Sequence, residues 1–214
     1  MIQEWLKKSE SIPRKHGLYR MEAILEALEN PERELKSIHI AGTNGKGSTA
    51  AMVTAFAKAH GLRVGTFTSP HMDNIRERIQ LDGVPLREES FWQAASVVRE
   101  VERLLFEEWG AFNYFEILTA MMFVVFQQEA VDLAIIEVGI GGLLDNTNVG
   151  HPLVSVITTI GLDHQDLLGS TLEEITAQKA GIIKPGQQVV VGPVTRECMD
   201  VIRDTASQQG ATIQ

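Results

Sequence analysis

The sequence contains little cysteine and little positive charge. Cys198 is its single cysteine, so no internal disulfide can form and no cysteine cluster can bind a metal. The 19 lysines and arginines are outnumbered by 28 aspartates and glutamates, which gives a formal net charge of −9. Because binding to a phosphate backbone needs clustered positive charge, nucleic acid is not expected as the main partner.

Long hydrophobic runs are also missing. The longest apolar run, residues 117–126, is much shorter than the roughly 20 residues that cross a bilayer. Residues 1–17 lack the apolar stretch of a signal peptide. We therefore expect no membrane partner and, with one cysteine, a protein of the reducing cytoplasm.

What is present is typical of a globular chain with a core. Of the 214 residues, 44% are hydrophobic and 22% charged, and the length suits one domain or at most two. Short apolar runs alternate with helical periods, which predicts an α/β fold with a mostly parallel sheet flanked by helices. Asp82-Gly83 between two extended runs predicts an inserted hairpin. The expected strands are 37–41, 63–68, 133–138, 154–159, 188–192 and 211–214, and the expected helices are 21–28, 48–60, 88–109, 115–129, 172–181 and 196–209.

A glycine-rich stretch at residues 38–49, IHIAGTNGKGST, follows the first expected strand. Glycines allow backbone N–H groups to surround a phosphate, and the N-terminus of the next helix adds the positive end of its dipole. Lys46 could reach the outer phosphates, and Ser48 or Thr49 could offer a hydroxyl to Mg²⁺. The stretch therefore predicts a phosphate-binding loop.

The match to the Walker pattern is imperfect. Ile40 stands where the first glycine belongs, and Gly47 separates Lys46 from Ser48. A glycine-rich structural turn is the alternative. His39, inside the strand, is expected to be a core histidine with a hydrogen-bond partner and not a ligand.

Polar side chains follow three further strands. Ser69, in TSPH, could supply a hydroxyl to a metal. Glu137 ends an apolar run, where P-loop enzymes keep the carboxylate that holds Mg²⁺. His164, in GLDHQD, could bind a metal through a neutral imidazole oriented by a neighbouring carboxylate. Taken singly, these segments could equally be a proline turn, a glycine turn and a solvated polar cluster.

The position of these four loops favours a shared functional site over a set of unrelated turns. All four leave the carboxyl ends of expected parallel strands, which is the edge where open α/β sheets bind ligands. We therefore expect one site that combines a phosphate loop, a carboxylate, a hydroxyl and a histidine.

Four segments together resemble folylpolyglutamate synthase and its bifunctional form with dihydrofolate synthase, within the Mur ligase superfamily. The resemblance covers residues 37–186, with the motifs in the family's order. The segments are HIAGTNGKGST, TSPHMDNIRERI, EVGIGGLLDNTNV and IGLDHQDLLGSTLEEITAQKAGIIKPG.

The resemblance implies roles for individual residues. Lys46, His164 and Lys179 would be catalytic, and Lys179 takes the place of a lysine that the family carries as a carbamate; an unmodified ammonium is the alternative. Mg²⁺ would be bound by Ser48, Ser69, Glu137 and His164. The ATP phosphates would be bound by Thr43, Asn44, Gly45, Lys46, Gly47, Ser48 and Thr49. The pterin pocket of the bifunctional enzymes would be lined by Phe115, Glu116, Leu144, Asp145 and Asn146.

Some features depart from the family. Leu143 replaces the usual arginine after the paired glycines, and Gln178 replaces a frequent glutamate before the modified lysine. Family members are close to twice as long and carry a C-terminal domain that closes over ATP. The last expected strand, 211–214, reaches the final residue. We therefore expect residues 1–214 to be a single, incomplete N-terminal ATP-binding domain without the C-terminal ligase domain, and to be weak or inactive alone.

The implied reaction belongs to folate biosynthesis and one-carbon metabolism. A folate or dihydropteroate carboxylate attacks ATP to give an acyl phosphate, and the amine of L-glutamate then displaces phosphate. The alternatives are a P-loop kinase or other NTPase, which leaves His164 and Lys179 without a role, and a nucleotide-binding module without catalysis.

Overall fold

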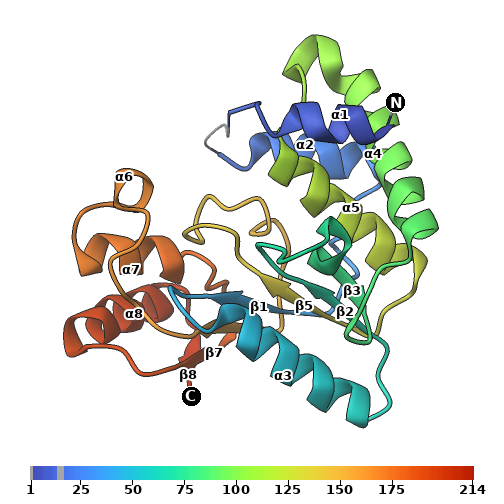
Figure 1. Ribbon diagram of the computed structural model, residues 1–214. Helices are drawn as coiled ribbons and strands as arrows, with labels where there is room; N and C mark the ends of the chain where they lie inside the picture. Colours follow the sequence, from blue (N-terminus) through green and yellow to red (C-terminus); the bar gives the residue numbers. More distant parts are fainter. Residues whose placement is uncertain (1, 14–16) are drawn as a thin grey trace.

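The computed structural model describes residues 2–13 and 17–214, which fold around one eight-stranded sheet (Figure 1). The strand order is β4-β3-β2-β5-β1-β6-β7-β8. All neighbours run parallel except β2 with β3 and β3 with β4. The expected mostly parallel α/β fold is therefore confirmed. The strands are β1 (Ser37–Ala41), β2 (Val64–Phe67), β3 (Ile79–Leu81), β4 (Val84–Pro85), β5 (Leu133–Glu137), β6 (Val154–Ile157), β7 (Gln188–Val191) and β8 (Thr212–Ile213).

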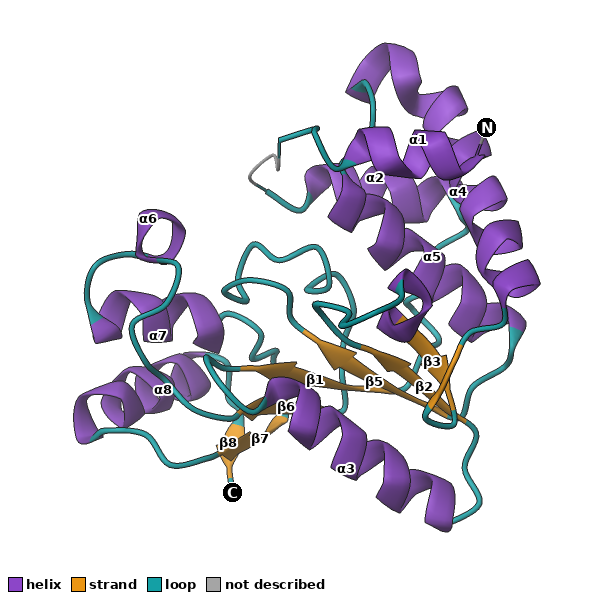
Figure 2. Cartoon of the chain, in the orientation of Figure 1, coloured by secondary structure: helices purple, strands orange, loops and turns teal. Residues whose placement is uncertain are grey.

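Helices cover both faces of the sheet (Figure 2). Helix α3 lies along one face, and α1, α2, α4 and α5 group on the other. None of the described helices is long and apolar enough to span a membrane. The helices are α1 (Ile2–Ser9), α2 (Tyr19–Ala27), α3 (Lys46–Ala59), α4 (Glu88–Trp109), α5 (Tyr114–Gln128), α6 (Gln165–Leu168), α7 (Leu172–Ala180) and α8 (Arg196–Gln208), with a 3₁₀ turn, η1 (Ile75–Arg78).

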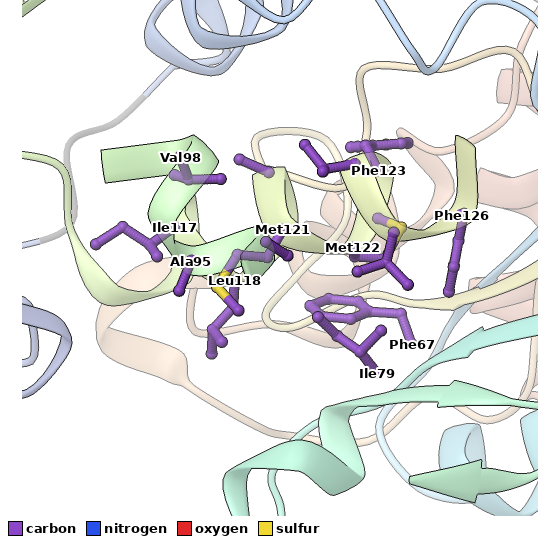
Figure 3. Close-up of a cluster of buried hydrophobic side chains, with 14 of the residues drawn as sticks. Phe67, Ile79, Ala95, Val98, Ile117, Leu118, Met121, Met122, Phe123 and Phe126 are labelled. Carbon is purple, nitrogen blue, oxygen red and sulfur yellow. The ribbon is translucent and has the colours of Figure 1, made fainter. Parts of the chain in front are cut away.

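Alternation along β5 divides the core between the two faces. Ile135 packs toward α3 with Ile40 and Ala50, whereas Ala134 and Ile136 belong to the larger cluster around α5. The larger cluster is built mainly by α5, whose apolar side chains lie over Phe67 and Ile79 (Figure 3). The helix expected at 115–129 is present as α5, and every residue from Phe115 to Phe126 is buried.

The expected hairpin extends the sheet at its edge. Asp82 and Gly83 both have positive φ angles, 52° and 77°, as a two-residue type I′ turn requires. The turn joins β3 to β4, and β3 pairs antiparallel with β2.

Two short helices were not expected from the sequence. Helix α1 is mostly polar, and burial of Leu6 in the larger core cluster stabilises it. The hydrophobic pattern of an eight-residue segment does not predict such a tertiary contact. Helix α6 is a single turn. Helix α3 begins at Lys46, two residues before the expected start. The expectation of no signal peptide concerns 1–17, of which 1 and 14–16 lie outside the described residues.

Candidate nucleotide-binding site

The four polar loops lie at one edge of the sheet, as expected. They follow β1, β2, β5 and β6, which are consecutive in the order β2-β5-β1-β6 and mutually parallel. Their carboxyl ends therefore meet, and the loop after each strand faces the same space.

The loop between β1 and α3 (residues 42–45) has the backbone of an anion cradle. Gly42 and Gly45 have φ angles of 146° and 85°, which side chains rarely adopt. Helix α3 starts directly after Gly45 and no side chain caps it, so its first N–H groups remain for an anion. Lys46 Nζ donates to the carbonyl oxygens of Gly42 at 3.0 Å and Thr43 at 3.3 Å, which holds the ammonium over the loop.

Gly42 is the tightest position of this loop. A Cβ atom there would lie 1.9 Å from Thr158 Oγ1, in addition to the strained φ angle. Gly42→Ala should therefore lower the free energy of unfolding by about 2 to 4 kcal/mol. Gly186→Ala is the matched control, because Gly186 has a φ angle of 69° but no neighbour within 4 Å of a Cβ atom. Chemical unfolding should show a cost of only about 1 kcal/mol for the control, and equal losses would contradict the steric account.

The loop after β6 fixes the phosphate loop from the side. Thr158 Oγ1 donates to Asn44 O at 2.7 Å, and the Asn44 N–H donates to Thr159 Oγ1 at 3.0 Å. Thr43 Oγ1 donates to Gly161 O at 3.1 Å and accepts from the Gly161 N–H at 3.0 Å. Neither Thr158 nor Thr159 was among the expected site residues. Two adjacent hydroxyls at the end of a parallel strand were the available signal.

Glu137 and Ser69 meet beside this loop. The Ser69 N–H donates to Glu137 Oε2 at 3.3 Å, and only 4% of Glu137 is exposed. Burial raises the pKa of the Glu137 carboxyl, and the nearby Lys46 ammonium partly opposes this shift. A cavity of about 420 Å³ opens here; among its lining residues are Gly45, Gly47, Ser48, Ser69 and Glu137.

This cavity fits a hard cation that also binds a phosphate. Its lining includes the Glu137 carboxylate and the hydroxyls of Ser48 and Ser69, and Mg²⁺ prefers such oxygen ligands completed by waters and phosphates. Within residues 2–13 and 17–214, no group of three His, Cys, Asp or Glu side chains forms a metal site by itself.

Lys179 and His164 occupy different environments. Lys179 is 2% exposed, and its Nζ donates to the Gly42 carbonyl oxygen at 3.0 Å. Burial, followed by the like charge of Lys46, lowers the pKa of Lys179 to about 8, against a smaller opposing effect of Asp163. His164 is 46% exposed, has a φ angle of 45°, and lies with its Nε2 3.6 Å from Asp163 Oδ1. The structure thus brings Lys179 to the phosphate loop and leaves His164 on an open loop that does not line the cavity.

The depressed pKa of Lys179 predicts a pH dependence of stability. Between pH 8 and the ordinary lysine value of 10.5, the unfolded chain binds more protons than the folded chain, so the free energy of unfolding rises with pH. The rise should be on the order of 2 kcal/mol and should be lost in Lys179→Met except for the contribution of Lys184, whose pKa burial also lowers. Urea titrations in carbon dioxide-free buffer from pH 7 to 9.5 measure it. The exposed-lysine control Lys58→Met should retain the rise, and parallel curves for wild type and Lys179→Met would refute it.

The five residues expected to line a pterin pocket are placed in three ways. Phe115 packs against the backbone of Gly139, where a Cβ atom would lie 2.5 Å from its ring, and it also lines a cavity of about 230 Å³. Glu116 is buried in an ion pair with Arg20, with Nε to Oε1 at 2.7 Å. The remaining three lie in residues 138–148, the glycine loop after β5: Leu144 is exposed, Asp145 is buried and Asn146 is half-buried.

Comparisons with known proteins agree with this architecture. One protein family, described as the Mur ligase middle domain, matches residues 40–213. A dihydrofolate synthase/folylpolyglutamate synthase of Bacillus subtilis is 43% identical over 202 residues, which cover 94% of this chain and 47% of the relative. The human mitochondrial folylpolyglutamate synthase is 41% identical, over 81% of this chain and 30% of the relative.

Solved structures give the same result. An FPGS structure described as a complex with AMPPCP and folate has a TM-score of 0.92 and 39% identity, covering 99% of this chain and 53% of that chain. A Mycobacterium tuberculosis folylpolyglutamate synthase, described as complexed with ADP and AMPPCP, has a TM-score of 0.91 and 36% identity, covering 100% and 50%. The chain spans about half the length of the bacterial relatives it matches. Because the family match covers most of the sequence, the chain belongs to the Mur ligase family and contains its middle domain.

Proposed function

We propose that this chain provides the ATP-binding domain of a cytoplasmic, ATP-dependent carboxylate–amine ligase that adds L-glutamate to a folate or dihydropteroate carboxylate. The observation that carries the proposal is the position of Lys179, whose Nζ lies 3.0 Å from the phosphate-loop carbonyl of Gly42. A kinase needs the phosphate loop and Glu137, but its reaction assigns no role to a second lysine there, and Lys179 is buried. Relatives named folylpolyglutamate synthase support the same activity.

The proposed reaction has two steps. A carboxylate oxygen of the folate substrate attacks the γ-phosphorus of ATP, the bond to the β-phosphate oxygen breaks, and ADP leaves as an acyl phosphate forms. The amine of glutamate then attacks the acyl carbon, loses a proton and expels phosphate, which yields an amide. Both steps bring anions together, so the enzyme's task is positioning and charge neutralisation. No side-chain nucleophile is needed.

The residues of the site have assigned tasks in this proposal. Residues 43–49 bind the ATP phosphates, with Lys46 as the cation at the transferred group. Ser48, Ser69 and Glu137 would hold Mg²⁺, which would neutralise phosphate charge, and His164 would be a further ligand although it does not line the cavity beside Glu137. Phe115 and Leu144–Asn146 form the wall for the carboxylate substrate, and Glu116 supports that wall through its pair with Arg20.

Glutamate dependence distinguishes a ligase from a kinase. The chain is incubated with ATP, Mg²⁺ and dihydropteroate or a reduced folate, with and without L-glutamate, while ADP and the amide product are quantified. A slow, glutamate-dependent release of ADP with an amide product supports the proposal. The rate is expected to be weak, because the chain spans about half the length of its bacterial relatives. ADP release that is indifferent to glutamate would identify an NTPase or kinase.

We further propose that Lys179 carries a carbamate. Its pKa of about 8 leaves much of the amine neutral near that pH, and a neutral amine adds to CO₂ with release of one proton. The product is an anion beside Lys46, so the repulsion between the two lysine ammonium groups is replaced by attraction between the carbamate and Lys46. In ¹³C-bicarbonate, the protein should show a carbamate ¹³C resonance that Lys179→Met lacks and Lys58→Met keeps. Identical spectra for all three proteins would exclude the modification.

A further inference from the structure

A line of buried hydrogen bonds connects β1 to the glycine loop after β5. His39 Nε2 lies 2.8 Å from Thr147 Oγ1, and Thr147 Oγ1 donates to Asp145 Oδ1 at 2.6 Å. Asp145 also accepts from the backbone N–H groups of Thr147 at 3.1 Å and Ile140 at 2.9 Å. His39, Asp145 and Thr147 are each 3% exposed. Asp145 therefore closes the turn from Ile140 to Asp145 from inside the protein.

The proton positions along this line follow from the donors and acceptors. A carboxylate only accepts, so the single hydroxyl proton of Thr147 is used on Asp145. The Thr147 oxygen must then accept from His39, which requires the proton on Nε2 of a neutral imidazole. Burial, followed by the charge of Lys184, lowers the pKa of His39 to about 3, so the ring is neutral at pH 7. The imidazole is thereby held in one tautomer as a donor.

The same loop is joined to the C-terminal end of α7. The Leu143 N–H donates to Gln178 O at 2.7 Å, and Asn148 Nδ2 donates to Leu143 O and Gly181 O, each at 3.0 Å. Gly142 permits this approach, because a Cβ atom there would lie 2.7 Å from Gln178 O. The glycine loop therefore rests directly on the helix end that carries Lys179.

Together with a contact of Lys179, these hydrogen bonds connect β1, the glycine loop, α7 and the phosphate loop in a ring. Lys179 Nζ returns to Gly42 O in the phosphate loop, and Gly42 follows His39 by three residues, directly after β1. The β1 segment therefore contacts the glycine loop through His39 and contacts α7 through Gly42. The glycine loop and α7 are in turn hydrogen-bonded to each other. A displacement of the glycine loop would have to break one of these bonds.

We propose that His39 is a positioning residue, which holds residues 140–147 through Thr147 and Asp145 so that the wall for the carboxylate substrate is set relative to the phosphate loop. The assignment of the wall rests on the proposed function, whereas the positioning itself does not. His39 does not line the cavity beside Glu137; it acts through Thr147.

The test compares side chains that can and cannot reproduce the Nε2 donor. His39→Gln places an amide N–H near the position of Nε2, whereas His39→Asn is too short and His39→Leu has no donor. In His39→Leu and His39→Asn, hydrogen exchange of the Ile140 amide should accelerate at least tenfold and folate should bind at least tenfold more weakly, with the affinity for Mg–AMPPCP changing less than threefold. His39→Gln should restore all values to within threefold of wild type. The exposed histidine variant His151→Leu is the control.

A second variant covers a failure of His39→Leu to fold. Thr147→Val keeps the imidazole and the side-chain shape but breaks the line at its centre, so it should match His39→Asn. In wild type, ¹⁵N spectra of the imidazole should show a proton on Nε2 at pH 7. Equal effects of His39→Gln and His39→Asn, or a proton on Nδ1, would overturn the proposal. Failure of the wild-type chain to bind folate would count against the proposed function alone, because exchange at Ile140 and the tautomer still decide the positioning role.

Discussion

Lys46→Met is expected to weaken the binding of Mg–AMPPCP by roughly 30- to 1,000-fold, or about 2 to 4 kcal/mol. The side chain lies over the phosphate loop, within hydrogen-bond distance of the carbonyl oxygens of Gly42 and Thr43. Its positive charge also opposes the rise that burial causes in the pKa of Glu137, more strongly than that of Arg78. Its removal leaves the nucleotide phosphates next to Glu137 without the fixed positive charge of the loop, since backbone N–H groups supply only partial charges.

Titration calorimetry measures this loss directly. The matched control is Lys58→Met, because Lys58 belongs to the same helix but is exposed and donates to the Asp82 carbonyl at 3.1 Å, away from the loop. The control should bind within threefold of wild type. Lys46→Met that binds as tightly as the control would show that the phosphates lie elsewhere.

Arg20→Met is expected to lower the free energy of unfolding by about 3 to 5 kcal/mol. Arg20 and Glu116 are 3% and 2% exposed, and the guanidinium donates to both carboxylate oxygens, at 2.7 and 3.2 Å. It also donates to the carbonyl oxygens of Trp109 and Ala111. Removing the guanidinium leaves a buried carboxylate without its cation, which is far more costly than the net value of the pair.

Urea unfolding with two further variants separates this mechanism from a simple loss of packing. Arg20→Met combined with Glu116→Gln should recover part of the stability, because a neutral amide needs no counter-ion. Arg103→Met, which removes the exposed partner of Glu100, should cost less than about 1 kcal/mol. A loss below 1 kcal/mol for Arg20→Met would contradict the account. The pair anchors the start of α5, where Phe115 packs on the glycine loop, and it thereby supports the substrate wall of the proposed function.

Local pattern was sufficient for the sheet and for the loops at its edge. Short, largely apolar runs predicted β1, β2, β5, β6 and β7 to within two residues, and Glu137 ends β5 as expected. His39 is a buried histidine with a hydrogen-bond partner, also as expected. These features could be predicted because a parallel strand that is buried on both faces has a nearly continuous run of hydrophobic residues.

Contacts between residues far apart in the sequence could not be predicted in this way. Arg20 and Glu116 are 96 residues apart, and Lys179 reaches Gly42 across 137 residues. Packing of Leu6 stabilises helix α1. The hydrogen bond from Thr158 to the Asn44 carbonyl oxygen forms only because β1 and β6 are neighbours in the sheet. Glu116 was expected at a pterin pocket from its motif; the structure adds the arginine that occupies its carboxylate, which no local pattern contains.

The most direct test of the central claim, that the four loops form one nucleotide site, is the set of backbone amide shifts that Mg–AMPPCP induces in the ¹⁵N-labelled chain. The largest shifts should fall on residues 42–49, on Ser69 and Glu137, and on residues 158–164, with smaller shifts near Lys179. Shifts centred on the groove between α2 and residues 149–151, which holds the larger cavity of about 800 Å³, or an absence of shifts at Lys46 and Glu137, would contradict it.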